Sequence, residues 1–244
     1  MGLSEFPVYV LSVRTFLDRH ESIKEQALRL GFDPSWIFEH DADKLTTNDH
    51  EKFAEKSDLP DRTKSLVLKH FAAMQQVVSK EIPYALILED DVIFFDDAQF
   101  RLEKIFSNLK PLSPGFLIFL GGADNKIDSR FLTLDRDSLV EAAITTTEAY
   151  IVDYEGCVRR LEHIERHGIE LPSDHQLQMM DPLLGIKHYK IADPICAQGS
   201  ITGLFDTKLD DSRKKHSKKF IKIRYAYNRF RRQVLPRFIR SFWK

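Results

Sequence analysis

One short segment constrains the fold of this chain more than any other: the apolar run Tyr84–Leu88 passes directly into three carboxylates, Glu89, Asp90 and Asp91, and apolar residues resume after them. A continuous apolar run of this length is typical of a strand buried on both faces of a parallel sheet. Desolvating a carboxylate is costly and adjacent like charges repel, so a buried strand needs compensation to end in this way. The segment predicts a buried strand with a polar site at its carboxyl end.

A divalent cation would supply that compensation. Oxygen ligands suit Mn²⁺ or Mg²⁺, ions that keep several waters and bind substrate phosphates alongside one or two carboxylates. The chain has no glycine-rich phosphate loop of the GxGxxG or GxxxxGK[ST] kind, so a bound diphosphate would be held mainly through the metal. The alternative is that the three acids cap the following element or lie in solvent.

Strand and helix patterns alternate along the chain, which predicts an α/β sandwich. Asp18 supplies an N-cap signal and Gly31 a stop signal for the first helix. Asp174 is expected to cap a short helix that runs to Met180. The predicted strands are 7–13, 36–38, 84–88, 116–120 and the extended segment 143–152, and the predicted helices are 18–30, 62–80, 97–109 and 154–167.

The formal net charge of −1 conceals a division of the chain. Residues 213–244 contain 13 Lys and Arg and no Asp or Glu, so the preceding residues carry −14. Hydrophobic residues at 43% and charged residues at 30% exclude a disordered chain and a polytopic membrane protein. We therefore expect one domain at 1–212 and a basic amphipathic tail at 213–244.

Three features favour a cytoplasmic protein. Cys157 and Cys196 have no CxxC or metal-like spacing, so neither a disulfide framework nor a zinc site is indicated. The first residues contain Glu5 and no basic region, unlike a signal peptide. No apolar run approaches the roughly 18 residues that a membrane span requires.

The basic tail has the pattern of an amphipathic helix, with Pro236 expected to kink or end it. Such a helix favours an anionic membrane surface as partner. The alternative is a helix docked on the acidic body. Nucleic acid is not expected, because no nucleic-acid-binding signature accompanies the charge. The apolar positions are Phe220, Ile223, Tyr227, Phe230 and Val234, continued by Phe238, Ile239, Phe242 and Trp243.

Five blocks, in this order, resemble the family 25 glycosyltransferases, bacterial enzymes of lipooligosaccharide and lipopolysaccharide assembly with collagen galactosyltransferases as relatives. The resemblance covers roughly residues 6–205. Its blocks are the strand Val8–Val13, the helix with His70 leading into Ala85–Val92 and then Leu120–Gly121, the segment Thr145–Val152, Leu171–Asp174, and Pro194–Gln198.

The resemblance implies a GT-A-like, nucleotide-sugar-binding α/β/α sandwich and inverting transfer from a donor that is usually UDP-galactose. It implies that Asp91 is the first metal ligand and that Glu89 and Asp90 contact the donor, with Glu89 as a further metal candidate. The chain departs from the family pattern at two places. The family commonly has Ser-His where this chain has Lys69-His70, and the arginine pair that is common after the first strand is reduced here to Arg14 and Arg19.

Inverting transfer requires a base for the acceptor hydroxyl, and Asp174 and Glu148 are the candidates. Asp174 is equally suited to a helix cap, and Glu148 to the solvent side of a strand. The remaining candidates are Tyr150 and Gln198 as donor contacts and His188 as a third metal ligand. The structural alternatives are core packing for Tyr150 and a structural loop role for Gln198. His70 is interpreted as a hydrogen-bonded core residue rather than a ligand. His163 and His167 lack a correctly placed HExxH glutamate and are interpreted as a solvated helix face.

These expectations combine into one hypothesis. The chain is a metal-dependent galactosyltransferase that uses UDP-galactose and Mn²⁺ or Mg²⁺. It acts on a lipid-linked saccharide and lies peripherally on the inner face of the inner membrane. The alternatives are transfer of glucose or N-acetylhexosamine by the same machinery, or a non-catalytic, membrane-associated saccharide-binding module.

Overall fold

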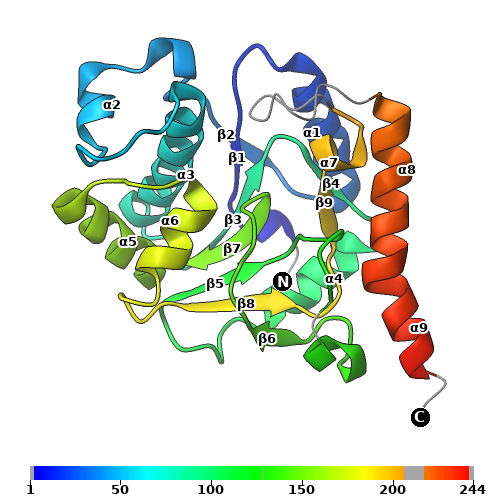
Figure 1. Ribbon diagram of the computed structural model, residues 1–244. Helices are drawn as coiled ribbons and strands as arrows, with labels where there is room; N and C mark the ends of the chain where they lie inside the picture. Colours follow the sequence, from blue (N-terminus) through cyan, green and yellow to red (C-terminus); the bar gives the residue numbers. More distant parts are fainter. Residues whose placement is uncertain (1–2, 128, 206–216, 242–244) are drawn as a thin grey trace.

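The computed structural model describes residues 3–127, 129–205 and 217–241. A seven-stranded sheet lies between two layers of helices, with the strand order β2-β1-β3-β7-β5-β8-β6 (Figure 1). Its strands are β1 Val8–Leu11, β2 Pro34–Ile37, β3 Tyr84–Glu89, β5 Phe116–Phe119, β6 Leu139–Glu141, β7 Ala149–Asp153 and β8 Lys187–Ile191. A second, two-stranded sheet pairs β4 Val92–Phe94 with β9 Cys196–Gln198.

The helices account for most of the remaining described residues. The α-helices are α1 Leu17–Leu30, α2 Thr47–Glu51, α3 Asp61–Ser79, α4 Ala98–Ser107, α5 Tyr154–His167, α6 Ser173–Met180, α7 Gly199–Thr202, α8 Lys218–Arg229 and α9 Leu235–Ser241. Short 3-10 helices occur at Leu3–Glu5, Ala42–Lys44 and Ser129–Thr133, and a π-helical turn, η5 Phe230–Val234, joins α8 to α9.

Strand direction brings several chain segments to one edge of the sheet. β1, β2 and β3 are parallel, and β7 runs antiparallel to both β3 and β5. The ends of β1, β3 and β5 therefore lie at the same edge as the start of β7. In open α/β sheets, ligands bind at the carboxyl edge of the parallel strands.

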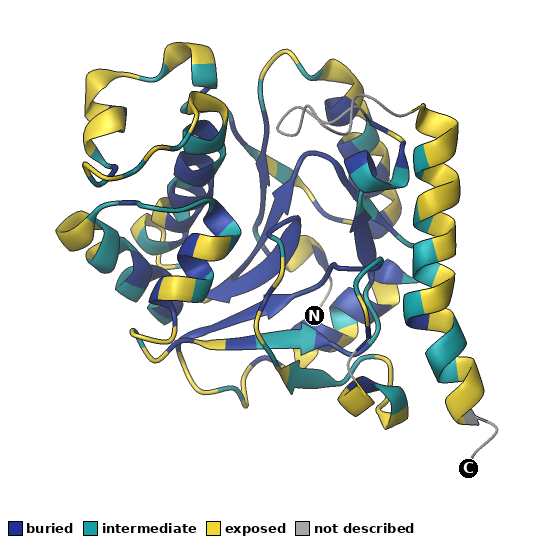
Figure 2. Ribbon diagram, viewed as in Figure 1, coloured by how far each residue is buried: buried dark blue, intermediate teal, exposed yellow. Residues whose placement is uncertain are grey.

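The central strands are buried on both faces, as their continuous apolar sequences predict (Figure 2). Alternate residues point to opposite faces: Val10 and Leu88 pack with α1 and α4, whereas Ile87 packs with α3 and α5. The two hydrophobic clusters that result confirm the α/β/α sandwich.

Two predicted helix caps are wrong in detail. α1 begins at Leu17, so Asp18 lies in its first turn and does not cap it. α6 begins at Ser173 after Pro172, and the Asp174 carboxylate accepts from the N–H of the next residue at 2.9 Å. Proline can hold the entry of a helix through its fixed φ, which makes a side-chain cap unnecessary. The expected end of α1 is confirmed, because Gly31 adopts the left-handed conformation with φ 75°.

The extended segment expected at 143–152 forms a strand only from Ala149 onward. Residues 143–147 form a loop along the sheet edge, and its last residues, Thr146 and Thr147, hydrogen-bond glutamates at that edge. The β-branched composition of this loop therefore serves side-chain hydrogen bonding rather than strand pairing.

Of the two outcomes expected at Pro236, a kink or an end of the tail helix, the end is wrong, because α9 runs through this residue. A proline removes the hydrogen bond to the carbonyl four residues earlier, here that of Arg232. That carbonyl instead accepts from the N–H of Ile127 at 3.1 Å, so the body satisfies the group that proline leaves free. No helix among the described residues is long and apolar enough to cross a bilayer. The predicted boundary between 212 and 213, and the aromatic residues 242 and 243, lie outside the described residues.

Candidate active site

The three adjacent carboxylates lie at the shared sheet edge, and each has a different environment. Glu89 is the last residue of β3, and its Oε1 accepts from the Thr147 hydroxyl at 2.9 Å. Its Oε2 accepts from Gln198 Nε2 at 3.3 Å, and His70 Nε2 lies 3.7 Å from Oε1. Burial raises the pKa of Glu89, but His70, Thr147 and Gln198 outweigh burial and lower it below its ordinary value. Glu89 is therefore held as an anion.

Asp90 is turned toward β1 and α1. Its Oδ1 pairs with Arg19 Nη1 at 2.5 Å, and its Oδ2 accepts from the Ser12 hydroxyl at 2.6 Å. Burial raises the pKa of Asp90 and Arg19 opposes that change. Both carboxylate oxygens are occupied within the protein, so Asp90 serves to fix the loop and the Arg19 side chain.

Asp91 has one carboxylate oxygen with no partner among the described residues. Its Oδ2 accepts from the Ser200 N–H at 3.3 Å, while Oδ1 is buried and makes no hydrogen bond there. Burial and the nearby Glu89 raise the pKa of Asp91 to about 7. An unpaired, buried carboxylate oxygen is costly unless a cation binds it.

The surroundings of Asp91 fit a metal that is shared with a ligand. Among the described residues, no three His, Cys, Asp or Glu side chains are grouped so that they could hold a metal ion. Mg²⁺ and similar ions are commonly bound by one or two carboxylates, with phosphate and water completing the coordination. The carboxylates at this edge could supply part of the coordination of such an ion, and phosphate and water would complete it.

Glu148 immediately precedes β7 and is buried, with 3% of its surface exposed. Its Oε1 accepts from the Gly122 N–H at 2.8 Å, and its Oε2 accepts from the Thr146 hydroxyl. Burial raises the pKa of Glu148 to about 7, although these hydrogen bonds oppose the change. A solvent-side strand position, the alternative expected from sequence, is therefore wrong.

The turn after β5 requires glycine because of this glutamate. A Cβ at Gly121 would lie 2.0 Å from Glu148 Oε1, and Gly122 has a φ of 83°. Because neither glycine has a side chain, only backbone atoms of this turn lie at the sheet edge beside Glu148. Backbone exposed in this way permits a ligand to approach closely.

A hydroxyl chain links Glu89 to the start of α6. The Thr147 hydroxyl bonds to Glu89 and lies 3.2 Å from the Ser173 hydroxyl. Asp174 follows Ser173 directly and is half-buried, and among the described residues its carboxylate is bonded only to the N–H of His175. The structure thus places Asp174 beside the same edge of the sheet.

Tyr150 and His70 lie behind the carboxylates and not at the surface of the site. The Tyr150 ring has 0% exposure, and its hydroxyl bonds to His70 Nδ1 at 2.7 Å. Full burial excludes ring stacking on a ligand, so the expected direct donor contact of Tyr150 is not compatible with its position. The interpretation of His70 as a hydrogen-bonded core residue agrees with the structure.

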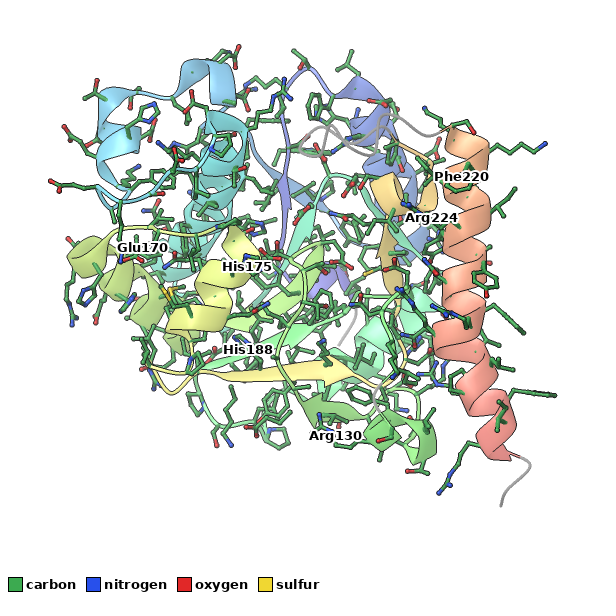
Figure 3. The ribbon with its side chains drawn as sticks, in the orientation of Figure 1. Arg130, Glu170, His175, His188, Phe220 and Arg224 are labelled. Carbon is green, nitrogen blue, oxygen red and sulfur yellow. The ribbon has the colours of Figure 1, made fainter. Side chains whose placement is uncertain are left out.

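His188 does not lie with the acidic cluster. It lies on β8, separated from β3 by β7 and β5, and its Nε2 bonds to Asp181 Oδ2 at 2.5 Å (Figure 3). Asp181 in turn pairs with Arg160 in the core. The expectation of a metal ligand is therefore wrong, because the imidazole completes a buried ion pair.

Sequence reasoning identified the carboxylates of the site but missed the groups that orient them. Ser12 and the backbone of Gly199 and Ser200 carry no recognisable motif, and Thr147 was visible only as one of three threonines. Arg19 and Lys69 stand at positions where the sequence departs from the family pattern. Arg19 holds Asp90, and Lys69 Nζ pairs with Asp41 at 2.8 Å at the neighbouring end of β2.

Solved structures of glycosyltransferases resemble this chain at low sequence identity. One is a glycosyltransferase involved in the glycosylation of the major capsid of PBCV-1, with 10% identity, a TM-score of 0.47, and 90% of this chain and 99% of that chain covered. Another is S. aureus TarS, residues 1–349, with 13% identity, a TM-score of 0.46, and coverage of 93% and 72% respectively. Mouse xyloside xylosyltransferase 1 has 14% identity and a TM-score of 0.39, with 78% and 76% covered. No curated protein matches the chain.

Residues 6–169 match the sequence profile of glycosyltransferase family 25, described as LPS biosynthesis protein. The matched region contains the edge residues Glu89, Asp90, Asp91 and Glu148 and ends before Asp174 and Gln198. It spans more than half of the chain. The chain belongs to glycosyltransferase family 25.

Proposed function

We propose that this glycosyltransferase is a metal-dependent, inverting enzyme that transfers galactose from UDP-galactose to a saccharide hydroxyl of lipooligosaccharide or lipopolysaccharide. Family membership supports the reaction class and the polysaccharide context. The observation that carries the metal dependence is the buried Asp91 Oδ1, which has no partner among the described residues at the edge where α/β sheets bind ligands.

In this proposal Asp91 holds the metal and its neighbours hold the donor. When bound, Mn²⁺ or Mg²⁺ supplies positive charge that offsets the charge of the departing diphosphate. Gln198 Nε2 donates to Glu89 Oε2 at the sheet edge, and in this proposal the half-buried Gln198 contacts the donor while the buried Glu89 holds it in place. Asp90 acts indirectly, through the loop that it ties to Arg19.

Asp174 is the proposed base. A general base must reach the acceptor hydroxyl, and Asp174 is half-buried with a single hydrogen bond to the described part of the chain, from a backbone N–H. Glu148 has a suitable pKa of about 7, but it is buried and both of its oxygens accept hydrogen bonds. We assign Glu148 the role of positioning the Gly121–Gly122 turn.

Donor hydrolysis tests the proposal without knowledge of the acceptor. We expect UDP release from UDP-galactose to require Mn²⁺ or Mg²⁺, and Asp91→Asn to lower the rate about 100-fold or more, the scale of losing one electrostatic contact in a transition state. The variant should fold, because the substitution removes a buried carboxylate whose pKa is raised.

Asp96→Asn is the matched control, since the Asp96 side chain is fully exposed and five residues farther along the same segment. It should release UDP at the wild-type rate. UDP-glucose and UDP-N-acetylhexosamines test the alternative donors. A chain that releases no nucleotide from any UDP- or GDP-sugar, with or without metal, would support the saccharide-binding module.

A further inference from the structure

The tail helix α8–η5–α9 has two unlike faces. One face docks on the body: Gln233 is buried, Arg237 Nη1 pairs with Asp193 Oδ1 at 2.7 Å, and Arg232 Nη1 donates to the Asp124 carbonyl at 3.0 Å. Arg229 lies over the Phe95 ring at 4.2 Å. The alternative that the tail helix docks on the acidic body is thus correct for this face. These contacts hold the helix along one side of the molecule (Figure 1).

The opposite face is apolar and exposed. Seven of the 14 large hydrophobic side chains that are exposed among the described residues belong to this one helix. From Phe220 to Phe238 they recur every three or four residues, so these six side chains lie along one side of the helix as an apolar ridge, and Ile239 directly follows Phe238. In Figure 2 much of this helix is coloured as exposed. Their exposed fractions lie between 47% and 60%, and they are Phe220, Ile223, Tyr227, Phe230, Val234, Phe238 and Ile239.

Basic side chains flank the ridge without ion-pair partners in the described part of the chain. Lys219, Lys222, Arg224 and Arg231 are exposed and make no salt bridge there, in contrast to Arg237 on the docked face. Phe220 and Arg224 lie in the first two turns of α8 (Figure 3). Some basic side chains of the tail therefore contact the body, whereas others on the same helix are exposed to solvent.

We propose that this face, residues 217–241, docks the protein on the surface of an anionic lipid bilayer, with the ridge inserted between headgroups and the basic side chains at headgroup level. Interfacial helices have this division of apolar and basic faces. A second copy of the chain does not fit, because two such faces would bring together basic residues with no acidic residue in residues 213–244 to offset them. Nucleic acid would leave the apolar ridge in water.

Two further observations agree with a lipid surface. A shallow groove lies between α9 and the 3-10 helix Ser129–Thr133, and its lining is mainly apolar with one arginine: Leu132, Leu235, Pro236, Ile239 and Arg240. At the other end, α8 begins beside α7, where Lys218 and Ile221 lie against Gly203. α7 supplies the N–H groups that bind Asp91, so the docked face begins next to the candidate active site.

Vesicle flotation of the full chain tests this proposal and needs neither donor nor acceptor. We expect binding to vesicles of phosphatidylglycerol and phosphatidylethanolamine, weaker binding at high salt, and little binding to phosphatidylcholine alone. Ile223→Ser with Phe230→Ser should reduce binding by at least tenfold. Arg224→Glu with Arg231→Glu should reduce it about fivefold or more for each charge removed.

The matched control is Leu28→Ser with Phe100→Ser, because these side chains are equally apolar and exposed but lie on α1 and α4. It should bind vesicles as the wild type does. All variants change exposed residues, and an unchanged thermal midpoint verifies their fold. Wild-type binding by either tail variant would overturn the proposal, as would tail-dependent binding to duplex DNA or RNA without binding to vesicles. UDP release, measured separately, is expected to be unchanged in every variant.

Discussion

At the end of β3, Glu89 and Asp91 experience opposite influences although only one residue separates them. Three donors surround Glu89 and lower its pKa, whereas Asp91 has one backbone donor and a pKa raised to about 7. Burial acts on both, so the difference arises from the hydrogen bonds around Glu89 and from the repulsion that the neighbouring Glu89 exerts on Asp91. Glu89 has hydrogen-bond partners within the protein for both carboxylate oxygens, and Asp91 is the carboxylate that a cation would stabilise most.

The two base candidates differ at the residue scale in a way that kinetics can resolve. We expect Asp174→Asn to lower kcat by about 10² to 10⁴ with little change in KM, because loss of a general base affects the transition state. Glu148→Gln should retain most of kcat, since an amide still accepts the Gly122 N–H bond. Steady-state UDP release measures both. The opposite pattern would assign the base to Glu148.

Glu148 should also make stability depend on pH. Its pKa is raised from 4.5 to about 7 in the folded state, so its contribution is fully present below about pH 4.5 and is lost as pH rises through 7. One pKa unit corresponds to about 1.4 kcal/mol, so the loss is about 3 kcal/mol. Urea unfolding of Glu148→Gln and wild type across this range should therefore diverge by about that amount.

The exposed Glu141 provides the control for this measurement. Glu141→Gln should follow the wild-type curve, because the Glu141 side chain is solvated and its partner Lys187 lies 3.5 Å away. Parallel curves for Glu148→Gln and wild type would show that folding does not raise the pKa of Glu148 above its ordinary value.

At the scale of elements, a buried ion pair ties α5 to the end of α6 and to β8. Arg160 Nη2 lies 2.7 Å from Asp181 Oδ2, with both side chains 0% exposed, and His188 bonds to the same oxygen. α5 and α6 cover the same face of the sheet, and α6 carries Asp174. The pair therefore supports the element that presents the proposed base.

Removing one member of this pair should destabilise the fold strongly. We expect Asp181→Asn to lower the free energy of unfolding by about 3 to 5 kcal/mol, since it leaves a buried guanidinium uncompensated. Glu155→Gln is the control, because its ion pair with Arg159, at 3.0 Å, is partly exposed and contributes about 1 kcal/mol or less. Urea denaturation compares the two. Similar small losses would show that Arg160 is adequately solvated without Asp181.

The tail shows how element boundaries depend on tertiary contacts. Proline is expected to break a helix, yet the chain remains helical through Pro236 because η5 changes the hydrogen-bond pattern and Ile127 satisfies the Arg232 carbonyl. Nothing local to residues 230–236 signals that partner, which lies more than 100 positions earlier in the chain.

At the scale of the whole molecule, donor and metal should bind as one unit and stabilise the native state together. UDP-galactose with Mn²⁺ at about 100 times the dissociation constant should add about 2.7 kcal/mol. For a chain of this size, that corresponds to a rise in Tm of about 5 to 10 °C. Asp91→Asn should lose most of the rise. An equal rise with donor in the presence of EDTA would contradict metal-mediated holding of the diphosphate.

The same scale explains the near-neutral net charge. The tail's basic residues are divided by the fold into a docked set, represented by Arg232 and Arg237, and an exposed set beside the apolar ridge. In the docked set Arg237 pairs with the Asp193 carboxylate, whereas Arg232 bonds the backbone carbonyl of Asp124. The exposed set accounts for the proposed attraction to anionic lipid.

The sequence by itself determined the sandwich, the edge on which the site lies, and the importance of Glu89–Asp91, because apolar runs, helical periodicity and buried charge are local patterns. Only the tertiary structure decided which carboxylate lacks a partner, that His188 belongs to a core ion pair, and that Tyr150 lies behind the site. These outcomes depend on contacts such as Glu89 with Thr147 and Asp90 with Arg19, which join residues 58 and 71 positions apart. Hydrogen bonding and burial are properties of such assembled neighbourhoods, and no local pattern specifies them.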